Sequence, residues 1–416
     1  MKRRIAAWLE QFRGDLKESA DPALLGGLRV FGLLYGRIDR SLTIDQALKK
    51  AWGRRLPANV GWQHAFGGVA YFLFMMLVVS GVLLTFYYRP SVEDAYPSIQ
   101  FIVTEAPFGW LIRDMHVWAA NLIVLALLSH MIRVLFSGAY KPPRETSWFV
   151  GVALLLVVFI FGVTGYLLPW DQWAYWATSE FMSGVESVPL IGGPLALFLR
   201  GDRIVSSATL SRFFALHVVI LPWLAFGLLS LHFVIVRSHG VAGSEGLPPD
   251  EGMPFYPNHL VRIFVVSVFL IAIVGSLAAL FPRPVGDPAT AFYPPDEMVS
   301  TWILVDVTRA ILAYLGSFGM VLAVLLAVAV IFLPLFDRNP ETELRKRPVV
   351  AILGTVLLVG FLVAWAVGHS LTEPLHPTGD SRGMIEERAV PPIPAPDLEA
   401  AVESDESDPD AVEVEP

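Results

Sequence analysis

Seven long apolar stretches, separated by polar segments, dominate the pattern of hydrophobic and polar positions along the chain. A helix needs roughly 20 apolar residues to cross a bilayer, and each stretch reaches that length. The pattern therefore predicts an all-α membrane protein with seven transmembrane helices. They are expected at about residues 64–87, 111–136, 148–168, 213–236, 260–281, 314–336 and 348–368.

Two of the connections between these stretches are longer than a turn requires. The third loop, at about residues 169–212, contains apolar pieces such as Val188–Gly192, and the fifth loop, at 282–313, is rich in proline. We expect short helices lying on the surface in both. Long loops on one side of a bundle and short ones on the other indicate a site or docking surface on the long-loop side.

Composition narrows the class of protein further. With 55% hydrophobic and 16% charged residues and a mean hydropathy of +0.57, the chain does not have the composition of a soluble globular protein. No feature suggests a nucleic-acid partner. The chain has no cysteine, which excludes disulfides, thiolate-bound zinc or iron–sulfur sites, and haem attached covalently through cysteine.

Charge is distributed unevenly along the chain. The formal net charge is −8, but residues 370–416 hold 13 acidic residues and 2 arginines, so the rest of the chain is weakly positive. This tail is too poor in apolar residues to form a core and is expected to be disordered. The first 57 residues carry 12 Lys and Arg and 6 Asp and Glu, which predicts a cytoplasmic amphipathic segment rather than a secretory signal.

Basic residues near the ends of the spans orient the bundle, since Lys and Arg are retained on the cytoplasmic side. With the N-terminus inside, the inner connections hold Lys141, Arg144, Arg237, Arg338, Arg345, Lys346 and Arg347. The outer connections are acidic, with Glu93, Asp94, Glu105, Glu180, Glu186, Asp202, Asp287, Asp296 and Glu297. The expected location is a bacterial inner membrane, with the N-terminus in the cytoplasm and the C-terminal tail outside.

Four histidines form a pattern within two of the spans. His116 and His130 lie in the second span, and His217 and His232 lie in the fourth. Ionisable groups inside a span are costly and usually functional. The two spacings, 14 and 15 residues, are close to four helical turns, so each pair lies near one face and about 21 Å apart along its helix.

Because the second and fourth spans run in the same direction, the sequence predicts an outer layer, His116 with His217, and an inner layer, His130 with His232. Each layer offers two axial nitrogens to one haem iron. Ligation by two histidines leaves no coordination position for oxygen, so such haems carry electrons. The alternative is two unrelated hydrogen-bonded histidine pairs. Two matched layers favour haem ligation.

Other residues near the layers fit haem binding. Arg113, Arg133 and Arg212 lie three to five residues from the histidines, where guanidinium groups can bind haem propionates. They equally fit arginines that extend to the membrane interface. Four glycines recur at the same spacing of fourteen, where a flat macrocycle would need room, although small-residue helix packing also explains them: Gly67, Gly81, Gly151 and Gly165.

Several motifs resemble the cytochrome b family of quinol:cytochrome c reductases and of the chloroplast and cyanobacterial plastoquinol complex. The resemblance covers about residues 57–370 and is strongest through the first four spans. In the chloroplast-type branch, which is the more similar one, the first four and last three spans are separate chains, and here they look fused. The motifs are Phe86-Tyr-Tyr-Arg-Pro90, Gly109–His116, His130-Met-Ile-Arg133, Lys141-Pro-Pro-Arg-Glu145, Gly165–Gln172 and Arg212–His217.

The first departure from that branch concerns covalent haem. The family attaches an additional haem through a cysteine before the first glycine pair, and this chain has Ala65 at that position. The resemblance therefore implies two non-covalent b haems and no covalent haem.

The second departure concerns the outer quinol site. The family carries Pro-Glu-Trp-Tyr in the fifth loop, whose glutamate takes the quinol proton, and here the aligned residues are Ser300–Ile303, which retain only Trp302. We expect a neighbouring acid to replace the glutamate: Glu297 first, then Asp296, with Asp306 less favoured because it lies further along. These acids also fit ordinary solvated loop charges.

The resemblance implies a bifurcated reaction in which quinol at the outer face delivers electrons to an iron–sulfur protein and to the outer haem, with proton release outside. The resemblance also implies that quinone is reduced near the cytoplasm. Arg237 matches a polar position of that quinone site, and His259 is a candidate proton donor there. Both residues also fit ordinary charges at the ends of membrane-spanning helices. The implied partners are a Rieske-type iron–sulfur protein, a c-type cytochrome, membrane lipid and a second copy of the complex.

These observations predict four parts: an N-terminal segment (1–57), a four-helix diheme domain (58–240), a three-helix quinone-site domain (241–370) and an acidic tail (371–416). The predicted function is the cytochrome b subunit of a quinol:cytochrome c oxidoreductase. A diheme membrane anchor that links a dehydrogenase to the quinone pool without bifurcation stays open as an alternative, because the outer-site motif is altered. A transporter or structural bundle without haem is a third possibility.

Overall fold

A computed structural model describes residues 55–56, 64–239, 253–254, 260–373 and 375. Nearly all of the predicted N-terminal segment and acidic tail, as well as His259, lie outside these residues. The elements are β1 (Arg55–Leu56), α4 (Phe66–Thr85), α5 (Ala95–Thr104), α6 (Gly109–Phe136), α7 (Glu145–Tyr166), α8 (Gln172–Glu186), α9 (Gly192–Arg200), α10 (Ser207–Ala215), the π-helix η2 (Leu216–Ile220), α11 (Leu221–His239), β2 (Met253–Pro254), α12 (Leu260–Leu280), α13 (Ile303–Ile331), α14 (Leu333–Phe336), the 3₁₀ helix η4 (Leu344–Lys346) and α15 (Pro348–His369).

The described residues contain seven helices long and apolar enough to cross a membrane, which confirms the predicted fold class. They are Phe66–Thr85, Gly109–Phe136, Glu145–Tyr166, Ser207–His239, Val261–Leu280, Ile303–Ile331 and Pro348–His369. The first, second, third, fifth and seventh agree with the predicted spans to within a few residues. Beside them, the strands form one antiparallel ladder, in which Arg55 pairs with Pro254 and Leu56 with Met253.

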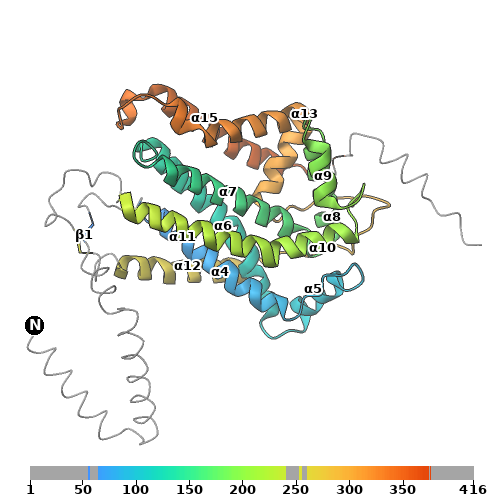
Figure 1. Cartoon of the computed structure of the whole chain (residues 1–416). Helices are drawn as coiled ribbons and strands as arrows, with labels where there is room; N and C mark the ends of the chain where they lie inside the picture. The colour runs from blue at the N-terminus through green and yellow to red at the C-terminus, as the bar shows by residue number, and fades with distance from the viewer. Residues whose placement is uncertain (1–54, 57–63, 240–252, 255–259, 374, 376–416) are drawn as a thin grey trace, which may run out of the picture.

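The spans pack as a four-helix part with the remaining three helices against it (Figure 1). Helix α4 packs on α6, and α11 packs on α7. Helix α12 lies against α6 and α4, while α13 and α15 pack on each other on the opposite side and contact α7 and α6. The core between α4, α6, α7 and α11 includes Leu73, Ile123 and Leu221.

Large apolar side chains on the outside of the bundle face away from this core. On α12, Phe264 and Phe269 are 66% and 67% exposed, and Trp223 on α11 is 76% exposed. Such surfaces are costly in water and are solvated by lipid chains, so they agree with an integral membrane protein.

At one end of the bundle, the third and fifth loops are tied together. Asp171 caps α8 by accepting from the Ala174 amide at 2.8 Å, and its other oxygen accepts from the Gly286 amide at 3.0 Å. Burial raises the pKa of the Asp171 carboxyl, while these amides oppose that rise. Helices α5, α8 and α9 gather at this end (Figure 1), which we call the α8 end.

The opposite end of the bundle is joined by a buried polar network. Lys141 lies 3.0 Å from Asp337, and the buried Arg347 donates to the Tyr140 hydroxyl at 2.7 Å. Tyr140 in turn donates to Asp337. These bonds join the loop before α7 to the segment before α15, so the four-helix and three-helix parts are linked at both ends.

Two expectations about the fifth loop are wrong. The sixth span begins at Ile303 rather than near residue 314, and the described residues between Phe281 and Trp302 contain no short helix. The reason is a cap from another helix: the Asn121 side chain on α6 accepts from the Ile303 amide and donates to the Thr301 carbonyl, both at 2.9 Å. The third loop does contain short helices, α8 and α9, as expected.

Candidate functional site

The outer-layer histidines lie side by side between α6 and η2. The ring centroids of His116 and His217 are 6.3 Å apart. Imidazole nitrogens bind transition metals at about 2 Å, so two imidazoles on one metal would have ring centres roughly 6 Å apart. The observed separation fits one metal ion between the two rings.

Neighbouring helices hold the Nδ1 atoms of both rings. Nδ1 of His116 lies 2.9 Å from the Ser80 hydroxyl on α4, which itself donates to the Met76 carbonyl. Nδ1 of His217 lies 2.9 Å from the Phe161 carbonyl on α7. Because a carbonyl only accepts, Nδ1 of His217 carries the proton, and the neutral ring keeps its free lone pair on Nε2. Such second bonds orient histidines that ligate metals.

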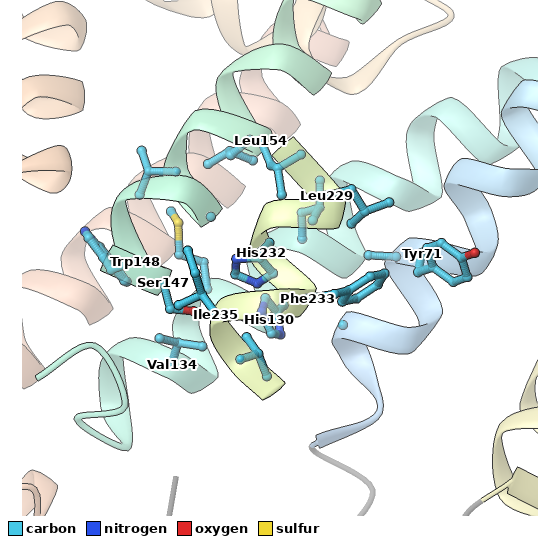
Figure 2. Close-up of a pocket in the computed structure, with 18 of the residues that line it drawn as sticks. Tyr71, His130, Val134, Ser147, Trp148, Leu154, Leu229, His232, Phe233 and Ile235 are labelled. Atoms are coloured by element: carbon cyan, nitrogen blue, oxygen red, sulfur yellow. The ribbon is translucent and has the colours of Figure 1, made fainter. Parts of the chain in front are cut away.

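The inner-layer histidines line a cavity of about 520 Å³ between α4, α6, α7 and α11. Figure 2 shows His130 and His232 beside each other, with Tyr71, Trp148 and Leu154 around them. This volume falls within the roughly 300–1,000 Å³ typical of cofactor pockets, and the lining is mainly apolar. The cavity fits a large, mainly apolar group, and Arg133 and Arg144 in its lining can meet polar substituents of that group.

Each of the four predicted glycines lies against one of the four histidines. A methyl group in place of the glycine hydrogen would lie 3.2 to 3.4 Å from ring atom Cε1 for the pairs Gly67–His130, Gly81–His116 and Gly151–His232. For Gly165 and His217 the same distance is only 2.4 Å. The glycines therefore give the imidazole rings the space they occupy, in addition to any space for a macrocycle.

A π-helical turn explains why the two histidine spacings differ by one residue. His217 lies in η2, Leu216–Ile220, between α10 and α11. A π turn takes up one residue more than an α turn. The 15-residue spacing in this helix therefore corresponds to the 14-residue spacing in α6, and the two layers stay in register. Sequence spacing alone does not reveal this turn.

The three predicted arginines differ in their surroundings. Arg133 lines the inner-layer cavity. Arg113 is buried and engaged by Asp114 at 2.8 Å and by the Arg283 carbonyl. Arg212 donates to the Phe198 carbonyl and packs against Gly201. Only Arg133 lies where it can contact a group held in that cavity.

The residues predicted for the two quinone sites lie at opposite ends of the bundle. Trp302 is buried at the α8 end, where its ring lies against Gly162. Asp296 and Glu297 are exposed, whereas Asp306 is 3% exposed and lies 3.3 Å from His369. At the other end, the Arg237 side chain is exposed. His64, Arg144 and His239 line the polar end of the inner-layer cavity there.

Sequence reasoning missed several polar residues beside these sites. Ser80 and Thr164, whose hydroxyls lie 2.9 and 3.3 Å from the outer-layer Nδ1 atoms, each directly precede a predicted glycine. That adjacency is a signal that could have identified them. Glu180 and Arg309 form an ion pair of 3.1 Å whose side chains are 3% and 2% exposed. No local pattern marks this pair, because its members are 129 residues apart.

Comparison with known proteins places this arrangement among membrane cytochromes. Residues 52–240 match the family model for cytochrome b/b6/petB. Cytochrome b6 of Synechococcus sp. (strain JA-3-3Ab) is 40% identical over 211 residues, covering 50% of this chain and 98% of that protein. Cytochrome b6 of Acaryochloris marina (strain MBIC 11017) is 41% identical with the same coverage.

A solved structure extends the likeness beyond the four-helix part. A chain of a hyperthermophilic respiratory complex III superposes with a TM-score of 0.73 and 26% identity, covering 82% of this chain and 92% of that one. This coverage is too large to be confined to the first 240 residues. The similarity therefore extends beyond residues 52–240, which match the family model.

Proposed function

The chain belongs to the cytochrome b/b6 family, and from this premise we propose that it passes electrons from quinol across the membrane through two b haems, coupled to proton translocation. As a cytochrome b of a bc-type complex, it is an integral membrane redox subunit with non-covalently bound b haem. The fused arrangement of four plus three spans agrees with the chain length. The number of haems, the quinone and the coupling are parts of the proposal.

The observation that carries the proposal is the pairing of histidines and glycines in two layers. His116 and His217 would hold one haem iron, and His130 and His232 would hold the other. Ser80 and the Phe161 carbonyl fix the outer-layer rings, and the glycines leave room for all four rings. Bis-histidine haem supplies reversible one-electron transfer without binding oxygen.

Arg133 would bind the propionates of the inner haem, since it lines the same cavity as His130 and His232. Arg113 and Arg212 would need to leave their present partners to do the same for the outer haem. The chain provides separate supports for the two layers: Nδ1 bonds to side chain and backbone in the outer layer, and an apolar cavity in the inner layer.

The α8 end of the bundle is the proposed outer face, with the quinol site beside Trp302. The bonds between the third and fifth loops give this face a defined surface for docking a Rieske-type iron–sulfur protein and a c-type cytochrome. These partners are required because the chain has no cysteine to hold an iron–sulfur cluster or a covalent haem itself. The second quinone site lies at the opposite end, near Arg237, and the N-terminus is cytoplasmic. A bacterial inner membrane, bound lipid and a dimeric complex complete the proposal.

The complex purified from its native membrane should oxidise a short-chain quinol and reduce cytochrome c, with proton release when it is reconstituted in vesicles. The reaction should need the iron–sulfur partner, because one electron of each quinol leaves by that route. Stopped-flow absorbance of b haem and cytochrome c follows both branches. Reduction of b haem by quinol without any reduction of cytochrome c would instead support a membrane anchor.

A further inference from the structure

A small cavity at the α8 end lies where three elements meet. Tyr166 from α7, Glu180 from α8 and Trp302 with Arg309 from the α13 region line it. Its volume is about 20 Å³, enough for one water molecule and too small for a quinol ring. Tyr166 directly follows Gly165, which contacts His217, so the cavity lies next to the outer layer.

Glu180 is the acid in the wall of this cavity. Arg309 donates to Oε2 at 3.1 Å, and the Leu375 amide donates to Oε1 at 2.8 Å. Removing two charges from water is costly, so a buried ion pair contributes little net stability. Burial raises the pKa of Glu180 to about 7, even though Arg309 and the Leu375 amide oppose the rise. An acid with a pKa near ambient pH is suited to exchange protons.

Trp302, which also lines the cavity, carries a donor without a partner in the described part of the chain. Nε1 of Trp302 is buried and has no hydrogen-bond partner among the described residues. A buried N–H without a partner is costly, and a water molecule commonly satisfies such a group. Trp302, Tyr166 and Glu180 all line the cavity, so a water held there would lie among side chains that carry polar groups.

We propose that Glu180 accepts the proton that quinol releases at the outer site, through a single water held between Trp302 and Glu180. This inference rests on the proposed function. The quinol O–H bond breaks and its proton passes through the water to the Glu180 carboxylate. Quinol loses two electrons and two protons in all. One electron would leave with the second proton for the iron–sulfur partner, and the other electron would leave for the outer b haem, so the step is balanced.

Glu180 fits this role better than the acids of the fifth loop. Glu297 and Asp296 are exposed and do not line the cavity. Asp306 is buried, but it faces His369 rather than this cavity. Arg309 from α13 and the Leu375 amide after α15 contact Glu180 directly, and Tyr166 from α7 lines the same cavity. Arg200 from α9 is paired with Glu186 instead.

The segment after α15 gives the proton a way out. Leu371 and Glu373 accept from the Arg309 guanidinium through their carbonyls, and the Glu373 side chain is exposed. Glu180 therefore lies between the buried cavity and a segment that reaches the surface. Glu180 can release its proton on that side without the proton crossing the helices.

Glu180→Gln in the purified complex tests the proposal. We expect quinol-dependent reduction of the outer haem to slow by roughly 100-fold, the range for loss of a general base, with the haem spectrum unchanged. Glu186→Gln on the same helix is the matched control and should retain a near wild-type rate, and Glu297→Gln tests the acid expected from the sequence. A wild-type rate in Glu180→Gln, or a large loss only in Glu297→Gln, would overturn the inference.

Glu180→Asp provides a second readout that a merely structural role would not move. In the wild type the rate of quinol oxidation should rise with pH to a plateau above about 7, because the acceptor must be ionised. Glu180→Asp should shift the midpoint of this rise while keeping both haems. The infrared difference spectrum on quinol oxidation should show a protonated carboxyl band that changes in Glu180→Asp. An unchanged midpoint and band would contradict the inference even if Glu180→Gln fails to assemble. Absence of quinol oxidation in the wild type would instead refute the proposed function and this step with it.

Discussion

Replacing His217 with leucine is expected to remove one b haem and leave the other in place. The outer-layer rings are 6.3 Å apart, so a haem between them would lose one of its two axial ligands. Leucine fills similar space but offers no lone pair. The inner layer lies about four helical turns away, on its own supports, and should keep its haem.

Haem content and reduced-minus-oxidised spectra of the purified variant measure this effect. The expected result is half of the wild-type b haem, with the inner-haem signal preserved. His369→Leu is the matched control, since His369 lies at the end of α15 with a 68% exposed side chain and in neither layer. Full haem content in His217→Leu, or equal losses in both variants, would refute the pairing of His116 with His217.

Placing a single methyl group at Gly165 is expected to disturb the outer haem nearly as strongly. The alanine Cβ would lie 2.4 Å from Cε1 and 2.9 Å from Nδ1 of His217, well inside van der Waals contact. The ring would have to leave the Phe161 carbonyl that orients it. We therefore expect Gly165→Ala to lose most of the outer haem.

Two other glycines provide a graded comparison. At Gly81 the new Cβ would lie 3.3 Å from His116, and at Gly68 it would meet no atom within 4 Å. Alanine within a helix is usually more stable than glycine by about 0.5–1 kcal/mol, so a loss of haem cannot come from helix propensity. Outer-haem occupancy should fall in the order Gly68→Ala, Gly81→Ala, Gly165→Ala. Equal occupancy in all three variants would show that glycine is not required beside the histidines.

The sequence predicts the spans well where apolar residues run without interruption, and less well where a helix begins with polar groups. Asp306 and Arg309 lie in the first turns of α13, so hydropathy places its start about ten residues too late. Their burial depends on partners in α8 and after α15. The Asn121 cap on Ile303 also comes from a distant helix, and no local pattern contains that information.

The candidate haem site could be predicted because its chemistry repeats at helical spacing. Four histidines and four glycines form two periodic sets, and the structure brings each glycine to one histidine. The π turn at His217 was not predictable, since it depends on how α10 and α11 pack against α7. From the sequence alone, Glu180 is one of several charges in an outer loop, because its partner Arg309 is 129 residues away.

The haem-to-chain ratio of the purified protein tests the central claim most directly. Haem extracted with acidified acetone and measured as the pyridine haemochrome should amount to two b haems per chain. No haem should remain on the denatured polypeptide, since the chain has no cysteine to hold haem covalently. A ratio of one or zero, or haem that stays attached after extraction, would contradict the two-layer account.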